Sequence, residues 1–162
     1  MNHKGLVVAL FILLLIDASS LWARDNGSEG ITVYGAGTSI LTGGGPGTTP
    51  VITKLGINFE NGSGHFDCLA LMPTPPAGTD GSGSFDNNIM YVTGPITAAS
   101  LQGGTVVLTG TATVTGVGAG TNKAFTVTAD RGGPGSRVVL VVSGLTFVET
   151  LLEGSISVPS SE

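Results

Sequence analysis

The fold of this chain is decided by residues 51–72, which read VITKLGINFENGSGHFDCLALM. In the first half of this stretch, apolar side chains and one threonine occupy every second position: Val51, Thr53, Leu55, Ile57 and Phe59. A period of two is typical of a strand with one buried face. Asn61-Gly62 then separates the two halves, and Asn-Gly between alternating runs is the strongest short signal for a hairpin turn. The stretch therefore predicts a β-hairpin that turns at Asn61-Gly62.

The returning half of the predicted hairpin, residues 65–72, alternates in the same way. One face carries Phe66, Cys68, Ala70 and Met72, and the other carries His65, Asp67, Leu69 and Leu71. We expect Phe59, Phe66 and Cys68 to be buried in the core. His65 lies on the opposite face and should be exposed.

Two later segments repeat this alternation. Thr105–Thr115 directs one set of small and apolar residues inward: Val106, Leu108, Gly110, Ala112 and Val114. Gly110 and Ala112 on that inner face indicate a crowded or bent place in the sheet. Ala124–Asp130 shows the same pattern through Phe125, Val127 and Ala129.

Further short strands complete the predicted sheet, at Ile31–Tyr34, Asn88–Thr93, Arg137–Val142, Leu145–Thr150 and Leu152–Val158. Arg137–Val142 is apolar on both faces, so we place it at the centre of the sheet. Prolines and glycines predict that residues 73–88 form a loop. Short strands with glycine turns and no helix predict one all-β domain over residues 31–158. Its fold class is a single antiparallel β-sandwich or partly closed barrel of eight or nine strands.

Residues 1–23, MNHKGLVVALFILLLIDASSLWA, have the three-part layout of a secretory signal peptide. Their apolar run is shorter than the roughly 20 residues that a transmembrane helix needs. Small residues at its end predict cleavage after Ala23 or Ser20. We therefore expect a secreted or periplasmic protein whose leader forms a helix apart from the β-domain. Residues 24–30 should be a disordered tail, and residues 159–162 a C-terminal tail.

The composition limits the classes of partner that the protein can bind. The formal net charge is −5, which disfavours nucleic acid and anionic membrane surfaces as partners. The single cysteine excludes an intrachain disulfide, so the core has to stabilise the fold without one. We expect no bound cofactor, and no integral membrane span once the leader has been cleaved.

His65 is the one histidine that remains after leader cleavage, so any histidine-dependent chemistry would have to use it. Asp67 shares its strand face, whereas Cys68 points to the opposite face, which disfavours a Cys–His dyad. With a third carboxylate, His65 and Asp67 would hold a metal ion. The competing interpretation is an exposed hydrogen-bonded pair beside the hairpin turn.

The segment from Asp80 to Asp86, DGSGSFD, carries oxygen ligands at alternate positions, which is a weak pattern for calcium. It lacks the central glycine and terminal glutamate of an EF-hand loop, so a solvated loop is the competing interpretation. The candidate metal ligands are thus His65, Asp67, Asp80 and Asp86. Neither a GxSxG nucleophile elbow nor a phosphate-binding loop occurs in the sequence, and we assign no catalytic residue.

Three stretches carry a resemblance to a known group of proteins: GHFDCLA at 64–70, residues 109–121, and FTVTADRGGPG at 125–135. In these turn glycines and Thr/Val strands, the chain resembles small secreted β-domains of environmental bacteria. One relative of that group sits behind copper-oxidase-like modules in larger exported proteins. The resemblance covers most of residues 31–158. It implies an exported β-domain and supplies no catalytic residues.

The sequence therefore favours an exported, non-enzymatic structural, cell-surface or interaction module. Its partner would be an unidentified protein or a cell-surface component. Two alternatives remain open: a calcium- or glycan-binding module, and a small secreted hydrolase or isomerase that uses His65 with Asp67.

Overall fold

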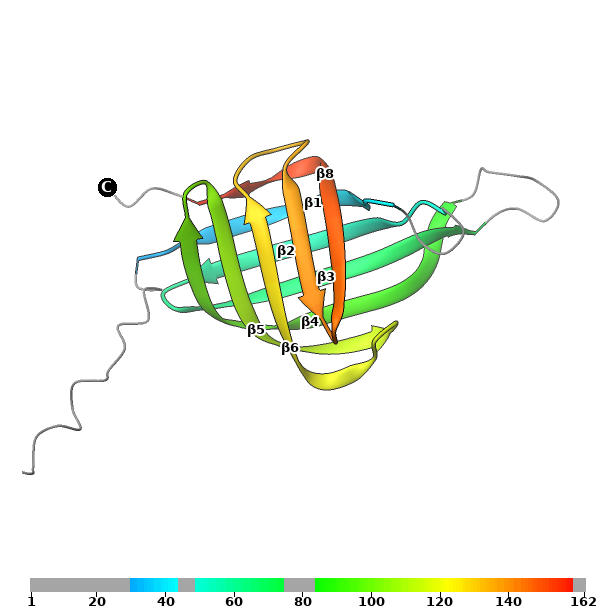
Figure 1. The fold of residues 1–162 in the computed structure, drawn as a ribbon, viewed down its shortest axis with the longest axis horizontal. Helices are drawn as coiled ribbons and strands as arrows, with labels where there is room; N and C mark the ends of the chain where they lie inside the picture. The colour runs from blue at the N-terminus through cyan, green and yellow to red at the C-terminus, as the bar shows by residue number, and fades with distance from the viewer. Residues whose placement is uncertain (1–29, 44–48, 75–83, 159–162) are drawn as a thin grey trace, which may run out of the picture.

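Eight antiparallel strands in chain order form a closed barrel (Figure 1). The computed structural model of the chain describes residues 30–43, 49–74 and 84–158, and this part contains no helix. The strands are β1 (Val33–Leu41), β2 (Ile52–Glu60), β3 (Ser63–Thr74), β4 (Ser84–Gln102), β5 (Thr105–Gly116), β6 (Gly120–Asp130), β7 (Arg137–Val142) and β8 (Leu145–Ser157). The all-β prediction is confirmed, and eight strands fall within the predicted eight or nine. The sheet is a closed barrel, so the sandwich is wrong and the closure is complete rather than partial.

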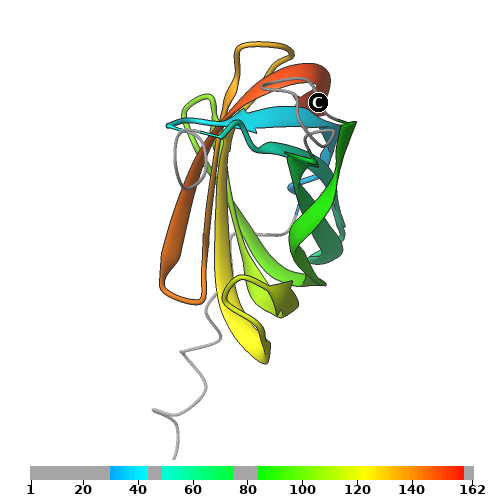
Figure 2. The same cartoon turned by 90° about the vertical axis from the view of Figure 1, so that its right-hand side faces the viewer.

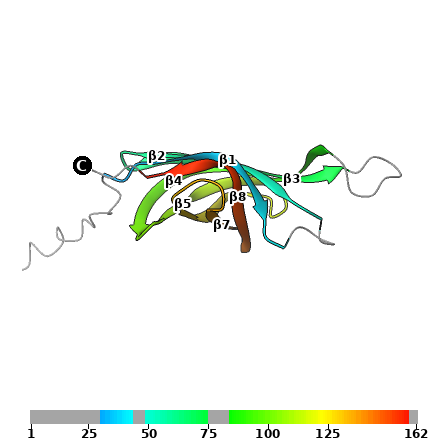
Figure 3. The same ribbon diagram turned by 90° about the horizontal axis from the view of Figure 1, so that it is seen from above.

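The barrel is closed by pairing between its first and last strands. β1 runs antiparallel to β8, from Tyr34 opposite Ser157 to Leu41 opposite Glu149. Figures 2 and 3 show β1 and β8 side by side, where the two ends of the sheet meet. Alternation within each strand is the same for a sandwich and a barrel, so the sequence pattern could not distinguish them. The barrel differs from a sandwich in one pairing, which joins the first strand of the domain to the last.

The hairpin of residues 51–72 forms as predicted. Glu60 pairs with Ser63, which leaves Asn61 and Gly62 as the two turn residues. Their φ angles are 53° and 79°. Positive φ at both central positions is the requirement of a type I′ turn, whose twist matches that of the flanking strands. Phe59, Phe66 and Cys68 are buried and His65 is exposed, so the predicted faces are confirmed.

The core fills the interior of the barrel. It includes the predicted inward residues of β5 and β6: Val106, Leu108, Ala112, Val114, Phe125, Val127 and Ala129. The rings of Phe66 and Phe125 lie 5.4 Å apart across this interior. Pairs of aromatic rings at this separation are mutually stabilising.

β4 is much longer than the sequence indicated, with 19 residues in place of the predicted Asn88–Thr93. It takes up residues 84–88, which were predicted to be loop, and Pro73 and Thr74 likewise belong to β3. Gly94-Pro95 hid the second half of β4, because both residues are normally depleted in strands. The ladder also shifts register between Ile96 and Ala98, which interrupts the alternation.

Two other predictions fail at β-bulges. Between Ala70 and Leu71 the register of β3 against β4 shifts, and Ile89 of β4 is left unpaired. Leu71 is buried at this bulge and Met72 is half-buried, against the prediction. β8 is a single strand where two were predicted, at 145–150 and 152–158. Its register against β1 shifts beside Leu152, and this shift interrupts the alternation in the sequence. A bulge adds one unpaired residue and reverses which face the following side chains occupy.

β7 is not buried on both faces. Val138, Leu140 and Val142 are buried, but Val141 is 39% exposed on the outside. β1 also runs past the predicted Ile31–Tyr34, to Leu41. In a closed barrel every strand has a neighbour on each side, so a central position does not exist.

The predictions for the leader at 1–23, for the tail at 24–29 and for residues 159–162 lie outside the described residues. Within the described part, no helix is long and apolar enough to cross a membrane.

Phe66→Ala should lower the free energy of unfolding by roughly 3–5 kcal/mol, because it removes a large side chain from a packed interior. Phe66 is 1% exposed. Urea unfolding followed by circular dichroism measures the loss. Leu101→Ala is the control, because Leu101 is 44% exposed. A loss below about 1 kcal/mol for Phe66→Ala would contradict the inward register of β3.

Gly110→Ala should destabilise the barrel by about 1–3 kcal/mol or more, through overpacking. A Cβ on Gly110 would lie 2.0 Å from the Pro95 carbonyl oxygen and 2.9 Å from the Phe125 ring. This confirms the crowding expected at this position. Gly104→Ala makes the same chemical change in the adjoining turn, where a Cβ would meet nothing within 4 Å. Equal midpoints of urea unfolding for the two variants would argue against the close approach of β4 and β5.

Candidate functional site

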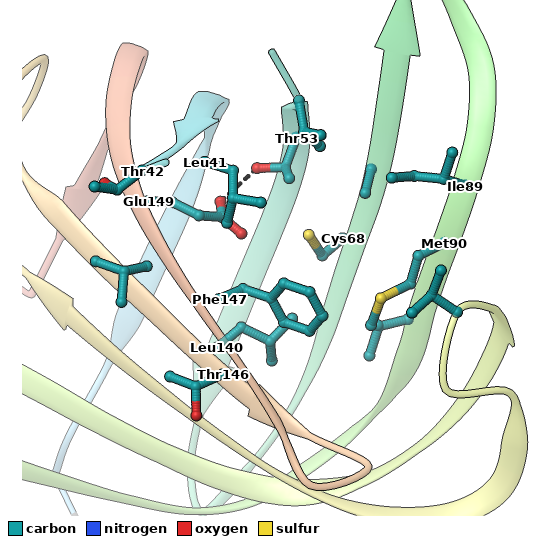
Figure 4. Close-up of a pocket in the computed structure, with 15 residues that line it drawn as sticks. Leu41, Thr42, Thr53, Cys68, Ile89, Met90, Leu140, Thr146, Phe147 and Glu149 are labelled. Atoms are coloured by element: carbon teal, nitrogen blue, oxygen red, sulfur yellow. Dashed lines mark hydrogen bonds between the residues drawn. The ribbon is translucent and has the colours of Figure 1, made fainter. Parts of the chain in front are cut away.

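A cavity of about 430 Å³ occupies one end of the barrel interior (Figure 4). Its wall is mostly apolar and comes from β1, β2, β3, β4, β7 and β8, together with Val117 after β5. Buried residues such as Val92 and Leu140 form its inner part, whereas Thr42, Val117 and Thr146 line it and are exposed. The cavity therefore reaches from the core to the surface at this end of the barrel.

The opposite end of the interior is filled by large side chains. Phe59 and Phe66 flank the turn at Asn61-Gly62, and Ile96 packs with them, each at most 1% exposed. The cavity lies at the other end of the same hairpin, where Val51, Thr53 and Ala70 line it. The position of bulky residues along the strands thus determines which end of the barrel stays open.

Glu149 is the one charged residue in the buried lining of the described part, and its side chain is 2% exposed. The Ser39 hydroxyl donates to Glu149 Oε2 at 2.5 Å, and the Thr53 hydroxyl donates to the same oxygen. Ser39 Oγ and Thr53 Oγ1 are also in hydrogen-bond contact with each other. Figure 4 shows the Glu149 and Thr53 side chains meeting at the cavity wall.

Burial raises the pKa of Glu149 above its ordinary value, because a desolvated carboxylate loses the stabilisation of water. The hydrogen bonds from Ser39 and Thr53 oppose this shift without cancelling it. No ion pair to Glu149 is found among the described residues. A buried carboxyl group with a raised pKa at the wall of a cavity is a marker of functional sites.

Cys68 lies at the cavity wall on β3. Burial raises the pKa of its thiol, and the negative charge of Glu149 adds to the shift. The side chain is therefore a neutral thiol, and it packs as a small apolar group. This agrees with its prediction as a buried hydrophobe.

The pair predicted as a site from the sequence, His65 and Asp67, lies outside the barrel. His65 and Asp67 are on the outer face of β3, beside a shallow hollow of about 240 Å³ with Gly35, Gly56 and Asn58. His65 Nε2 lies 2.9 Å from Thr93 Oγ1. The two residues are neighbours on one face, as expected.

Of the candidate metal ligands that the structure describes, Asp86 lies apart from His65 and Asp67. His65 pairs with Pro95 at one end of the β3–β4 ladder, whereas Asp86 lies at the other end, beside the pairing of Met72 with Asn87. Asp80 is outside the described residues. Within residues 30–43, 49–74 and 84–158, no three His, Cys, Asp or Glu side chains are grouped to hold a metal. The metal hypothesis stays a prediction without a third ligand.

Sequence analysis missed Glu149 and Ser39. A signal was present, because Glu149 stands between Phe147 and Leu151 at the period of two that marks an inward face. A charged residue at such a position is the informative exception to burial rules. Thr53 was placed on the inward face, but no role was assigned to it. Ser39 lies in the part of β1 that was not predicted.

Comparisons with known proteins found no matching family model, no similar curated protein and no similar solved structure. The resemblance to exported bacterial β-domains therefore stays a prediction.

The free energy of unfolding should depend on pH through Glu149. Its pKa is raised in the folded protein, so the folded state holds this proton more tightly than the unfolded chain does. The contribution to stability is fully present below the ordinary pKa of 4.5 and is lost as pH rises through the folded-state pKa. As pH rises through this range, the free energy of unfolding of Glu149→Gln should increase progressively relative to that of the wild type.

Urea unfolding at a series of pH values measures this difference. Glu153→Gln is the matched control, because Glu153 lies on the same strand but is exposed. It should keep the wild-type profile. A difference between wild type and Glu149→Gln that does not change with pH would contradict the raised pKa of Glu149.

Proposed function

We propose that this protein is a non-enzymatic binding protein that takes up a small, largely apolar molecule inside its barrel. The observation that carries the proposal is the cavity of about 430 Å³, with a mostly apolar wall and two buried polar residues, Thr53 and Glu149. Ligand cavities of proteins measure about 300–1,000 Å³ and combine apolar walls with a few convergent polar groups. Eight-stranded barrels have interiors wide enough for one small ligand.

The exposed residues at the end of the cavity support entry from solvent. Val117 is 49% exposed and lines the cavity, and Leu145 close by is 37% exposed. Gly118, next to Val117, is bonded through its carbonyl oxygen to the Ser143 hydroxyl at 2.8 Å, which holds the two neighbouring turns together. An apolar rim lowers the cost of bringing an apolar ligand to the opening.

Binding is also the better proposal for a secreted or periplasmic protein of this kind. The leader would place the barrel outside the cytoplasm, where small apolar molecules need a carrier or a receptor to stay in water. An enzyme built on His65 and Asp67 would have to act on the outer face of β3, away from the cavity. No observation on the described residues favours the calcium- or glycan-binding alternative.

The experiment uses N-phenyl-1-naphthylamine, a neutral dye whose fluorescence rises in apolar surroundings. We expect the purified mature protein to bind it with saturation. Ala70→Leu should weaken binding by roughly tenfold, because the larger side chain takes up cavity volume without removing an existing contact. Ala70 lines the cavity and is half-buried.

Ala124→Leu is the matched control, because Ala124 is exposed on β6 and does not line the cavity. It should bind the dye like wild type. Dye binding that is absent in wild type, or that falls equally in both variants, would show that the barrel interior is not the binding site.

A further inference from the structure

Apart from the Cys68 thiol, the polar side-chain groups of the cavity are all oxygens. Among the described lining residues they belong to Thr42, Thr53, Thr146 and Glu149, and no lining residue carries a side-chain N–H. Ser39 stands behind the carboxyl group and bonds to it. A ligand that enters the cavity therefore meets side-chain hydrogen-bond acceptors and a few hydroxyl protons.

The hydroxyl protons beside Glu149 are already in use. Ser39 and Thr53 each own one hydroxyl proton, and both donate to Glu149 Oε2. What remains for a ligand is the set of oxygen lone pairs on the carboxylate and on the two hydroxyl groups. The anchor of the cavity, defined here as Glu149 with Ser39 and Thr53, is thus rich in acceptors and poor in donors.

The anchor also carries an uncompensated negative charge when Glu149 is ionised. The four lysine and arginine residues in the described part are Lys54, Lys123, Arg131 and Arg137, and none of them lines the cavity. A cation placed there interacts strongly, because the apolar wall lowers the local dielectric constant. A bound anion would be repelled for the same reason.

We infer that the cavity selects small amphiphilic amines, with the ammonium group on the Glu149 anchor and the hydrocarbon part against the apolar wall. This inference rests on the proposed function and names the ligand class of the same cavity. An ammonium group brings three donors, no acceptor and a positive charge, which complements the anchor in both respects. An alcohol brings one donor and no charge, and a carboxylate brings only acceptors.

Three probes of equal chain length test the inference: octylamine, 1-octanol and octanoate. Each displaces N-phenyl-1-naphthylamine from the mature wild-type protein, and calorimetry gives the affinity directly. Octylamine should bind roughly tenfold or more tightly than 1-octanol, since its positive charge adds an ion pair with Glu149 to the hydrogen bond that either head group can donate. Octanoate should bind most weakly.

Glu149→Gln keeps the shape of the side chain and removes its charge. In this variant octylamine should lose roughly tenfold in affinity, whereas 1-octanol should change by less than about threefold. Thr53→Val is a second variant, because it removes one hydroxyl group from the anchor at nearly constant volume. It should retain most of the preference for octylamine, since the charge of Glu149 remains.

A measurement on the wild-type protein alone keeps the test independent of how the variants fold. Octylamine affinity should fall as pH is lowered, because protonation of Glu149 removes its anionic partner, whereas 1-octanol affinity should stay constant. Cys68 is the titratable group that faces Glu149 from β3, and its raised pKa keeps it neutral over this range. Ser39 on β1, Thr53 on β2, Met90 and Val92 on β4, and Leu140 on β7 do not titrate there.

The outcomes separate the two proposals. If the dye binds and Ala70→Leu weakens it, but octylamine binds no better than 1-octanol, the preference for amines is wrong and the binding function stands. The preference for amines is also wrong if Glu149→Gln leaves the ratio of the two affinities unchanged. If neither the dye nor any of the three probes binds, the binding function itself is wrong.

Discussion

The pairing of β1 with β8 is the constraint on which the rest of the structure depends. It turns a meander of eight strands into a ring, so that one face of every strand becomes interior. The two backbones approach closely where Gly37 lies opposite Gly154. A Cβ on Gly154 would lie 2.0 Å from the Ala36 carbonyl oxygen, and its φ of 91° is a conformation that favours glycine. Closure therefore depends on glycine at this crossing.

The bulge beside Leu152 connects closure to the cavity. Between Thr38 and Ser39 the register against β8 shifts by one residue, and Leu152 is left over with 49% exposure. Before the bulge, Glu149 and Leu151 point inward at odd positions of β8, and after it Ile156 does so at an even position. The bulge thus lets both halves of β8 bury apolar residues, and it brings Glu149 inside beside Ser39. Without it, one half of the strand would present the wrong face.

The extent to which the sequence predicted the structure follows from the range of each interaction. The hairpin at Asn61-Gly62 and the inward faces of β5 and β6 depend on neighbours in sequence, so alternation was sufficient. Closure and the bulges in β4 and β8 depend on pairing between distant segments, which alternation does not encode. Glu149 was missed for another reason: its position followed the inward pattern, but its chemistry contradicted the rule that charged residues face water.

A buried carboxyl group without a cation costs the folded protein stability, and an apolar residue at position 149 would fill the same space more favourably. The neighbouring hydroxyl groups reduce this cost, since Ser39 and Thr53 lie directly opposite each other on β1 and β2 and both donate to one oxygen. Core packing does not require two polar residues to be buried on adjacent strands solely to donate hydrogen bonds to a third. Departures from the packing rules are concentrated at functional sites. Here the buried polar residues Thr53 and Glu149 lie at the wall of the cavity, with Ser39 bonded to Glu149, at the end of the barrel that bulky side chains leave open.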